Sequence, residues 1–133
     1  MTDEKQQQQM QKYMELQQID QQMKQIQKQL MLLDEQIQEL HITKQALDDI
    51  KNTEPGTGIL APVSSGIFIS SELKDNKEVR INVGSGTVVK KSIPEAKELI
   101  QKQLDEIKKI HKDMLANMQN LGEQAEMLQK ELM

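Results

Sequence analysis

Residues 16–47 read LQQIDQQMKQIQKQLMLLDEQIQELHITKQAL, a run with neither glycine nor proline. Large apolar residues recur in it alternately three and four positions apart, until Lys44 takes one apolar place. This alternation is the a and d pattern of a coiled coil, because it returns apolar side chains to one narrow seam of a helix. The seam comprises Leu16, Ile19, Met23, Ile26, Leu30, Leu33, Ile37, Leu40 and Leu47. The spacing predicts a coiled-coil helix over residues 4–52.

A second seam with the same spacing occupies the last part of the chain. It comprises Ile100, Leu104, Ile107, His111, Met114, Met118, Leu121, Ala125, Leu128 and Leu132. Ser92 and Glu95 stand in the S-x-x-E relation of a capping box, with Pro94 in the first turn, so a helix is predicted over residues 94–133. Two long helices with one seam each bury both seams by pairing. We expect an antiparallel pair in which residues near 50 face residues near 96.

Residues 53–93 have a different character. Glycine and proline after residue 53 end the first helix, and four short β-like runs follow at residues 59–63, 67–73, 79–83 and 87–91. Apolar and polar residues alternate in these runs, which predicts two hairpins with one apolar face each. The expected fold class is α+β: a long antiparallel coiled-coil hairpin of two helices with two β-hairpins inserted between them.

This inserted segment is too small to enclose a core of its own. Isolated hairpins are marginally stable in water, and open strand edges invite pairing with another chain. Because both helices leave from the same side, we expect residues 53–93 to be an oligomerisation segment. The apolar residues expected at its interface are Ile59, Leu60, Pro62, Val63, Ile67, Phe68, Ile69, Leu73, Val79, Ile81, Val83, Val88 and Val89.

The far ends of the two helices carry more apolar residues than the seams require. Methionine is flexible and polarizable, so it suits contacts with irregular apolar surfaces. We therefore expect a promiscuous binding site at this tip; frayed termini, initiator Met1 and ordinary methionine usage are the alternative explanation. The candidate tip residues are Met10, Tyr13, Met14, Leu16, Met127, Leu128, Leu132 and Met133.

Composition argues against several classes of function. The net charge is −4, Arg80 is the single arginine, and the lysines are interleaved with acids, so no basic stripe is available for nucleic acid. No stretch is apolar enough to span a membrane, and there are no cysteines, which together favour a cytoplasmic protein.

No catalytic residues, metal ligands or cofactor site are expected. His111 in the seam is interpreted as a register-setting residue rather than a ligand or pH sensor, and Gly84-Ser85-Gly86 as a turn rather than a phosphate cradle.

The middle segment resembles the prefoldin family. Residues 60–68 read LAPVSSGIF, which is similar to the L-x-P-[LV]-G-x-G-x-[FY] stretch of α-type prefoldin subunits, except that Ser64 replaces a glycine. Val83-Gly84-Ser85-Gly86, followed by Val88-Val89, is a second match. The resemblance implies an ATP-independent chaperone subunit in a hexamer of two α and four β subunits, which holds unfolded proteins at its tips and passes them to a group II chaperonin. The rival interpretations are a structural or filament-forming scaffold and an enzyme with a site at an oligomer interface.

Overall fold

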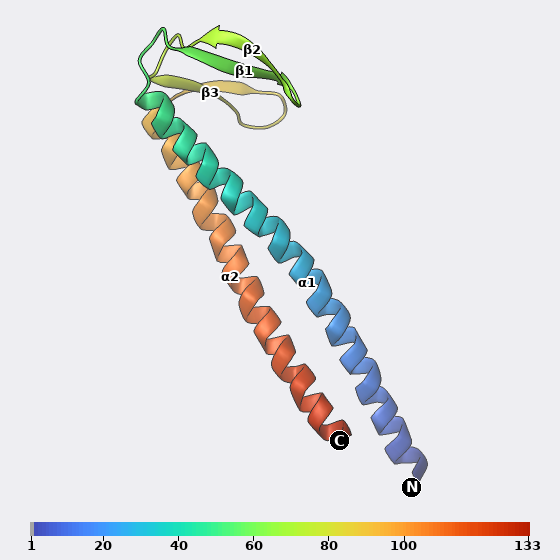
Figure 1. The fold of residues 1–133 in the computed structure, drawn as a ribbon. Helices are drawn as coiled ribbons and strands as arrows, with labels where there is room; N and C mark the ends of the chain where they lie inside the picture. The colour runs from blue at the N-terminus through green and yellow to red at the C-terminus, as the bar shows by residue number, and fades with distance from the viewer. Residues whose placement is uncertain (1) are drawn as a thin grey trace. The chain divides into compact units, whose positions relative to one another are not determined.

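The computed structural model describes residues 2–133 and contains two long helices with two pairs of strands between them (Figure 1). This is the fold class that the sequence predicts. The elements in chain order are α1 (Thr2–Lys51), β1 (Gly58–Ser64), β2 (Ile67–Glu72), β3 (Glu78–Asn82), β4 (Val88–Ser92) and α2 (Ile93–Leu132). The start of α2 is capped as expected, because the backbone N–H of Glu95 donates to Ser92 Oγ at 3.2 Å.

One compact unit holds α1 as far as Ile37 and residues Glu106–Met133. The two helices are antiparallel here, because Lys12 Nζ lies 3.1 Å from a carboxylate oxygen of Glu131 and His111 Nε2 lies 2.9 Å from Asp34 Oδ1. Every seam residue of this unit is half-buried or buried, with Leu30 at 7% exposure. His111 therefore has a specific polar partner across the seam, in agreement with a role in register.

The second compact unit comprises Gln38–Asp105, in which the end of α1 pairs with the start of α2. Lys44 donates to Gln101 Oε1 at 2.7 Å across the seam, so the lysine at an a position is accommodated by an amide. Most of the buried side chains of the chain lie here: Leu47, Ile93, Ala96, Ile100 and Leu104. This unit therefore contains the best-packed part of the helix pair.

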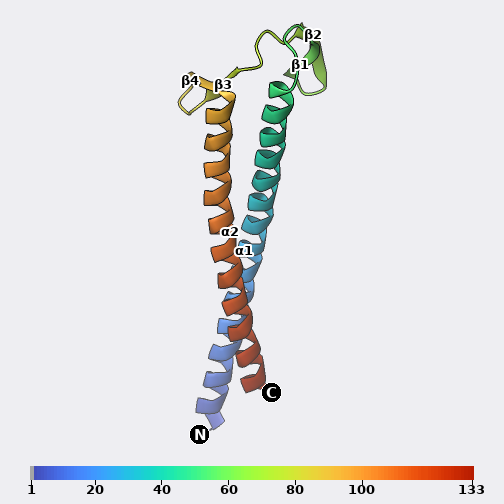
Figure 2. The same ribbon diagram turned by 90° about the vertical axis from the view of Figure 1, so that its left-hand side faces the viewer.

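The strands form two separate antiparallel pairs, β1–β2 and β3–β4, and do not join into one sheet. Figure 2 shows the first pair next to the end of α1 and the second next to the start of α2. The register of β1–β2 shifts between Pro62 and Ser64, which marks a bulge. Three expected strand ends are wrong, because Leu73, Val83 and Thr87 lie just outside the strands. Each is at a point where the chain passes between a strand and a loop.

The segment Gly84-Ser85-Gly86 is the turn between β3 and β4. Its three residues have φ values of 114°, 51° and 73°, the left-handed region that glycine adopts without steric cost. Val83 N–H donates to Thr87 O at 2.9 Å and closes the loop. The tight-turn interpretation of this glycine-containing segment is therefore confirmed.

The connection between the two strand pairs is tied to the helix ends. Leu73 exchanges backbone hydrogen bonds with the loop that follows α1, accepting from Gly56 at 2.6 Å and donating to Thr57 at 2.9 Å. Asn76 Nδ2 donates to Thr53 O at 3.2 Å, and Ile93 N–H donates to Lys77 O at 3.0 Å. Both strand pairs are thus held at their base by backbone hydrogen bonds.

One ion pair near this junction leads to a pH prediction. The hydrogen bond from Lys97 lowers the pKa of the Asp48 carboxyl below its usual value, and a smaller effect of burial opposes it. A carboxyl with a lowered folded-state pKa stabilises the fold above its unfolded pKa of about 3.9. That contribution is lost as the pH falls through the folded-state pKa. The melting temperature of the unmodified chain should fall when the pH is lowered from neutral to below the unfolded pKa. In the Asp48→Asn variant we expect this fall to be smaller.

Asp49 supplies the control for this measurement. It is the neighbouring residue and accepts a hydrogen bond from the Gln45 amide at 3.2 Å rather than from a lysine. Asp49→Asn should leave the acid dependence of the melting temperature close to that of the unmodified chain. An equal effect of the two substitutions would rule out the Lys97 contact as the cause.

Candidate functional site

The β1–β2 pair exposes apolar side chains on both of its faces. Pro62 pairs with Phe68 on one face, and Ala61 pairs with Ile69 on the other. Phe68 is 56% exposed and Ile69 is 54% exposed. The expectation of one apolar face is therefore wrong for this pair. The reason is local, because consecutive apolar residues in a strand must point to opposite sides.

The β3–β4 pair is less exposed. Val79, Ile81 and Val89 share one face and are half-buried, whereas the opposite face is polar except for Val88, which is exposed. The ladder of this pair continues through the hydrogen bond of Ile93 into the first turn of α2, so the strands lie close to the helix. The β3–β4 hairpin therefore leaves less apolar surface uncovered than β1–β2, with Val83 and Val88 as its exposed apolar residues.

The predicted interface residues fall into two groups in the structure. Leu73 is half-buried, like the three residues of the β3–β4 face. The exposed group comprises Ile59, Leu60, Pro62, Val63, Ile67, Phe68, Ile69, Val83 and Val88. Each strand of both pairs also has one free edge, because each sheet contains two strands. An apolar surface next to free backbone hydrogen-bonding groups is suited to pairing with another chain.

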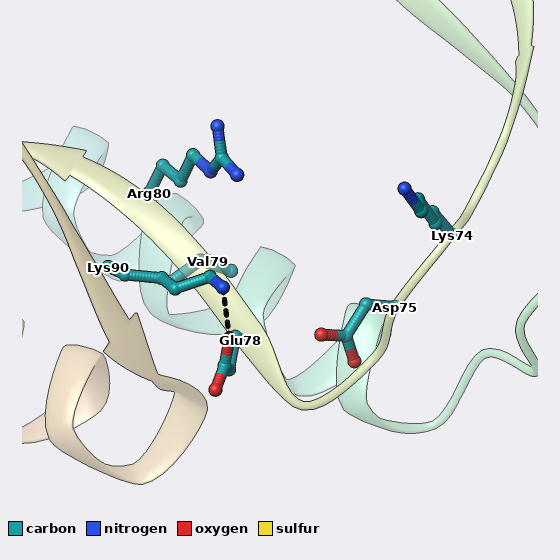
Figure 3. Close-up of a pocket in the computed structure, with 6 residues that line it drawn as sticks. All are labelled: Lys74, Asp75, Glu78, Val79, Arg80 and Lys90. Atoms are coloured by element: carbon teal, nitrogen blue, oxygen red, sulfur yellow. Dashed lines mark ion pairs between the residues drawn. The ribbon is translucent and has the colours of Figure 1, made fainter.

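The polar side of β3 borders a hollow that sequence reasoning did not identify. Figure 3 shows Lys74 from the preceding loop and Arg80 from β3 extending toward this hollow, which Asp75 and Glu78 also line. Lys90 pairs with Glu78 at 3.4 Å, and Asp75 Oδ1 accepts the N–H of Lys77 at 2.8 Å. The signal available in the sequence was the position of the single arginine on the polar side of a strand.

The predicted tip residues also divide into two groups. Leu16, Leu128 and Leu132 are half-buried in the seam, so their first role is in pairing the helices. The exposed group, at 57% exposure or more, comprises Met10, Tyr13, Met14, Met127 and Met133. Initiator Met1, part of the alternative explanation for this pattern, lies outside the described residues.

The exposed tip residues lie on different sides of the seam. Met10, Tyr13 and Met14 are spaced i, i+3 and i+4, so they occupy one face of α1. By their heptad positions, Tyr13 (e) and Met133 (b) are on the same flank of the helix pair, and Met127 (c) is on the other. Met10 is also at a b position, so three of the five exposed tip residues lie on the flank marked by the e positions.

That flank contains a groove between the helices, a little inward from Tyr13. The residues that line it are Leu16, Gln17, Asp20, Met23, Ala125 and Gln129. The sequence pattern placed Ala125 in the seam, but the groove that its small side chain leaves was not predicted. The signal was visible, because every other position of the second seam has a larger side chain.

Two kinds of site are absent from the part of the chain that the structure describes. Within residues 2–133 no group of three or more His, Cys, Asp or Glu side chains is arranged to hold a metal ion. None of the described helices combines the length and the apolar character needed to cross a membrane.

Comparison with known proteins identifies the family to which the chain belongs. The sequence model of the prefoldin subunit family matches residues 19–133, which is most of the chain. The chain belongs to the prefoldin family. Among individual relatives, prefoldin subunit alpha of Methanobrevibacter smithii is 36% identical over 87 residues, covering 65% of this chain and 59% of the relative. Prefoldin subunit alpha of Archaeoglobus fulgidus is 26% identical over 94 residues, covering 71% of this chain and 69% of the relative.

A solved structure has the same fold. The filamentous prefoldin from Methanocaldococcus jannaschii superposes with a TM-score of 0.80 and covers 90% of this chain and 98% of its own, at 18% identity. The resemblance of the middle segment to α-type prefoldin subunits thus agrees with the relatives found among archaea. Ser64, which departs from the family's glycine, ends β1, and Gly66 takes the positive φ of 79° in the turn that follows. The turn therefore does not need a glycine at residue 64.

Proposed function

We propose that this prefoldin chain is an ATP-independent chaperone subunit that binds non-native proteins at the free ends of α1 and α2. The observation that carries the proposal is the face formed by Met10, Tyr13 and Met14, which are 69%, 57% and 62% exposed. Non-native chains expose apolar segments, and burying such surface is favourable without any chemical energy source. Methionine adapts to differently shaped partners, which suits many clients.

Assembly through the strand pairs completes the proposal. Exposed apolar side chains and free edges of β1–β2 support pairing with β-type prefoldin subunits in a hexamer of two α and four β chains. Several tips then contact one client together. Weak contacts at linked sites raise the overall affinity through effective concentration, so a client is held firmly although each contact is weak. Release follows when a group II chaperonin competes for the same apolar segments of the client.

A triple substitution tests the tip. Met10→Gln, Tyr13→Gln and Met14→Gln together remove the apolar face while keeping charge and helix propensity. Each buried apolar side chain contributes about 1.5 kcal/mol or more, so the affinity of one tip for a client should fall at least about tenfold. We expect light scattering to show that the assembled complex no longer suppresses aggregation of a denatured client in the absence of nucleotide.

The control is Met31→Gln with Leu32→Gln, because these residues are 64% and 59% exposed on the same helix. That variant should suppress aggregation like the unmodified complex, and native mass should be unchanged for both variants. A scaffold protein predicts a different result, since its unmodified complex would leave client aggregation unaffected. Suppression that requires added nucleotide would also contradict the proposal.

A further inference from the structure

The groove on the e flank follows from a shortage of side-chain volume in the seam. Ala125 occupies a heptad a position at which the neighbouring seam residues are Leu121 and Leu128. Gly122, on the same flank, adds no side chain, and a Cβ placed there would lie 3.9 Å from Met23 Cε. Ala125 and Gly122 together supply little side-chain volume at this level, where a groove lined by Leu16 and Met23 of the facing helix lies beside Ala125.

The groove has an apolar floor and a polar rim. Leu16, Met23 and Ala125 belong to the two seams and form the floor, whereas Gln17, Asp20 and Gln129 stand at flanking positions. Tyr13 lies three and four positions before Leu16 and Gln17 on the same helix, so the groove is continuous with the exposed tip face. An apolar side chain of a partner helix can enter such a groove while its polar face stays in water.

The charges around the groove determine which partner fits. Counted over residues 2–24 and 122–133, seven acidic residues stand against four lysines. Asp20 is on the rim and is paired with Lys24 at 3.3 Å, but both side chains are about two-thirds exposed, so the pair is readily exchanged. A surface with excess negative charge attracts cationic segments and disfavours anionic ones.

We infer that the groove binds an amphipathic segment of a non-native protein whose large apolar residue enters beside Ala125 and whose lysine or arginine lies toward Asp20. This inference rests on the proposed chaperone function and adds the class of client segment that the tip prefers. Segments that combine apolar residues with positive charge bind more tightly than otherwise equal segments with negative charge.

The central experiment fills the groove in the full chain within its assembled complex. Ala125→Leu supplies the missing seam side chain, so the melting temperature should stay equal or rise while the entry point for a client side chain disappears. The probes are two fluorescent helical peptides with the same apolar residues, one flanked by lysines and one by glutamates. We expect the lysine peptide to bind the unmodified complex more tightly, and Ala125→Leu to weaken it about tenfold or more.

The matched control is Ala116→Leu, an exposed alanine of α2 on the side of the helix away from the seam. It makes the same chemical change and should leave the affinity for both peptides as it was. A second variant, Asp20→Lys, needs no change in the seam, because Asp20 is exposed. It should reduce the preference for the lysine peptide by about two- to fivefold, an effect that added salt also reproduces.

The outcomes separate this inference from the proposed function. If Ala125→Leu complexes bind the lysine peptide with unchanged affinity, the groove is not the binding site. This conclusion would hold even where the complexes still suppress aggregation. Equal binding of the two peptides by the unmodified complex would overturn the charge preference. Failure of the unmodified complex to suppress any aggregation would instead remove the chaperone function on which the inference depends. If Ala125→Leu does not assemble, the Asp20→Lys result decides the charge preference.

Discussion

Phe68→Asp is expected to abolish assembly of the complex while leaving the chain folded. Phe68 is 56% exposed in the single chain and lies opposite Pro62 on one face of β1–β2. An apolar ring in such a position becomes buried when a second chain covers the strand pair. Burying a carboxylate there instead, without a partner, carries a large desolvation cost.

The expected size of the effect is large because aromatic residues at interface centres dominate binding energy. Loss of one such residue weakens association by about 2 kcal/mol or more, which is about 30-fold per contact. A complex built from several such contacts should dissociate at micromolar concentration. Native mass measurement of the purified complex detects this dissociation. Circular dichroism should show that the helix content is unchanged.

Ile42→Asp is the matched control for this substitution. Ile42 is also exposed, at 68%, but it lies on α1 rather than on a strand. It should leave the mass of the complex unchanged, which would separate a specific interface from a general effect of adding charge to an apolar surface. A Phe68→Asp chain that assembles normally would show that β1–β2 is not the contact between subunits.

Leu104→Ala is expected to have the largest effect on stability. Leu104 has 0% exposure and lies on α2 in the best-packed part of the helix pair. Removing a fully buried leucine loses its transfer free energy and leaves a cavity, so the free energy of unfolding should fall by about 2–5 kcal/mol. Urea unfolding followed by circular dichroism measures this, at one fixed protein concentration because assembly also stabilises the fold.

Leu115→Ala makes the same change on the same helix at a position that is 48% exposed. Its cost should be no more than about 0.5 kcal/mol, as for most surface substitutions. Equal costs at the two positions would mean that Leu104 is not the buried core residue of α2.

The helices could be predicted from the sequence because the information is local and repetitive. Apolar residues alternately three and four positions apart define a seam without any knowledge of the partner. The antiparallel register also followed, since each helix had one seam to bury, and the contacts of Lys44 with Gln101 and Lys97 with Asp48 agree with it. The tip and interface residues were selected by the same local reasoning, and their roles in binding remain predictions.

The details of the surfaces could not be predicted in the same way. Period-two alternation indicated one apolar face for each hairpin, yet Phe68 and Ile69 expose both faces of β1–β2. Val79 and Ile81 of β3 are half-buried instead, although they follow the same alternation. The backbone hydrogen bonds that join segments separate in the sequence, such as Ile93 with Lys77, are also not visible in the local pattern.

The sequence by itself determined two paired helices, two inserted hairpins and the residues that belong to each seam, because heptad spacing and turn residues act over a few positions. Only the tertiary structure decided which apolar residues stay exposed and that Ala125 leaves a groove beside Met23. A heptad pattern specifies the direction in which a side chain points. Whether the space in that direction is filled depends on the volume of the residues that the opposite helix brings to the same level.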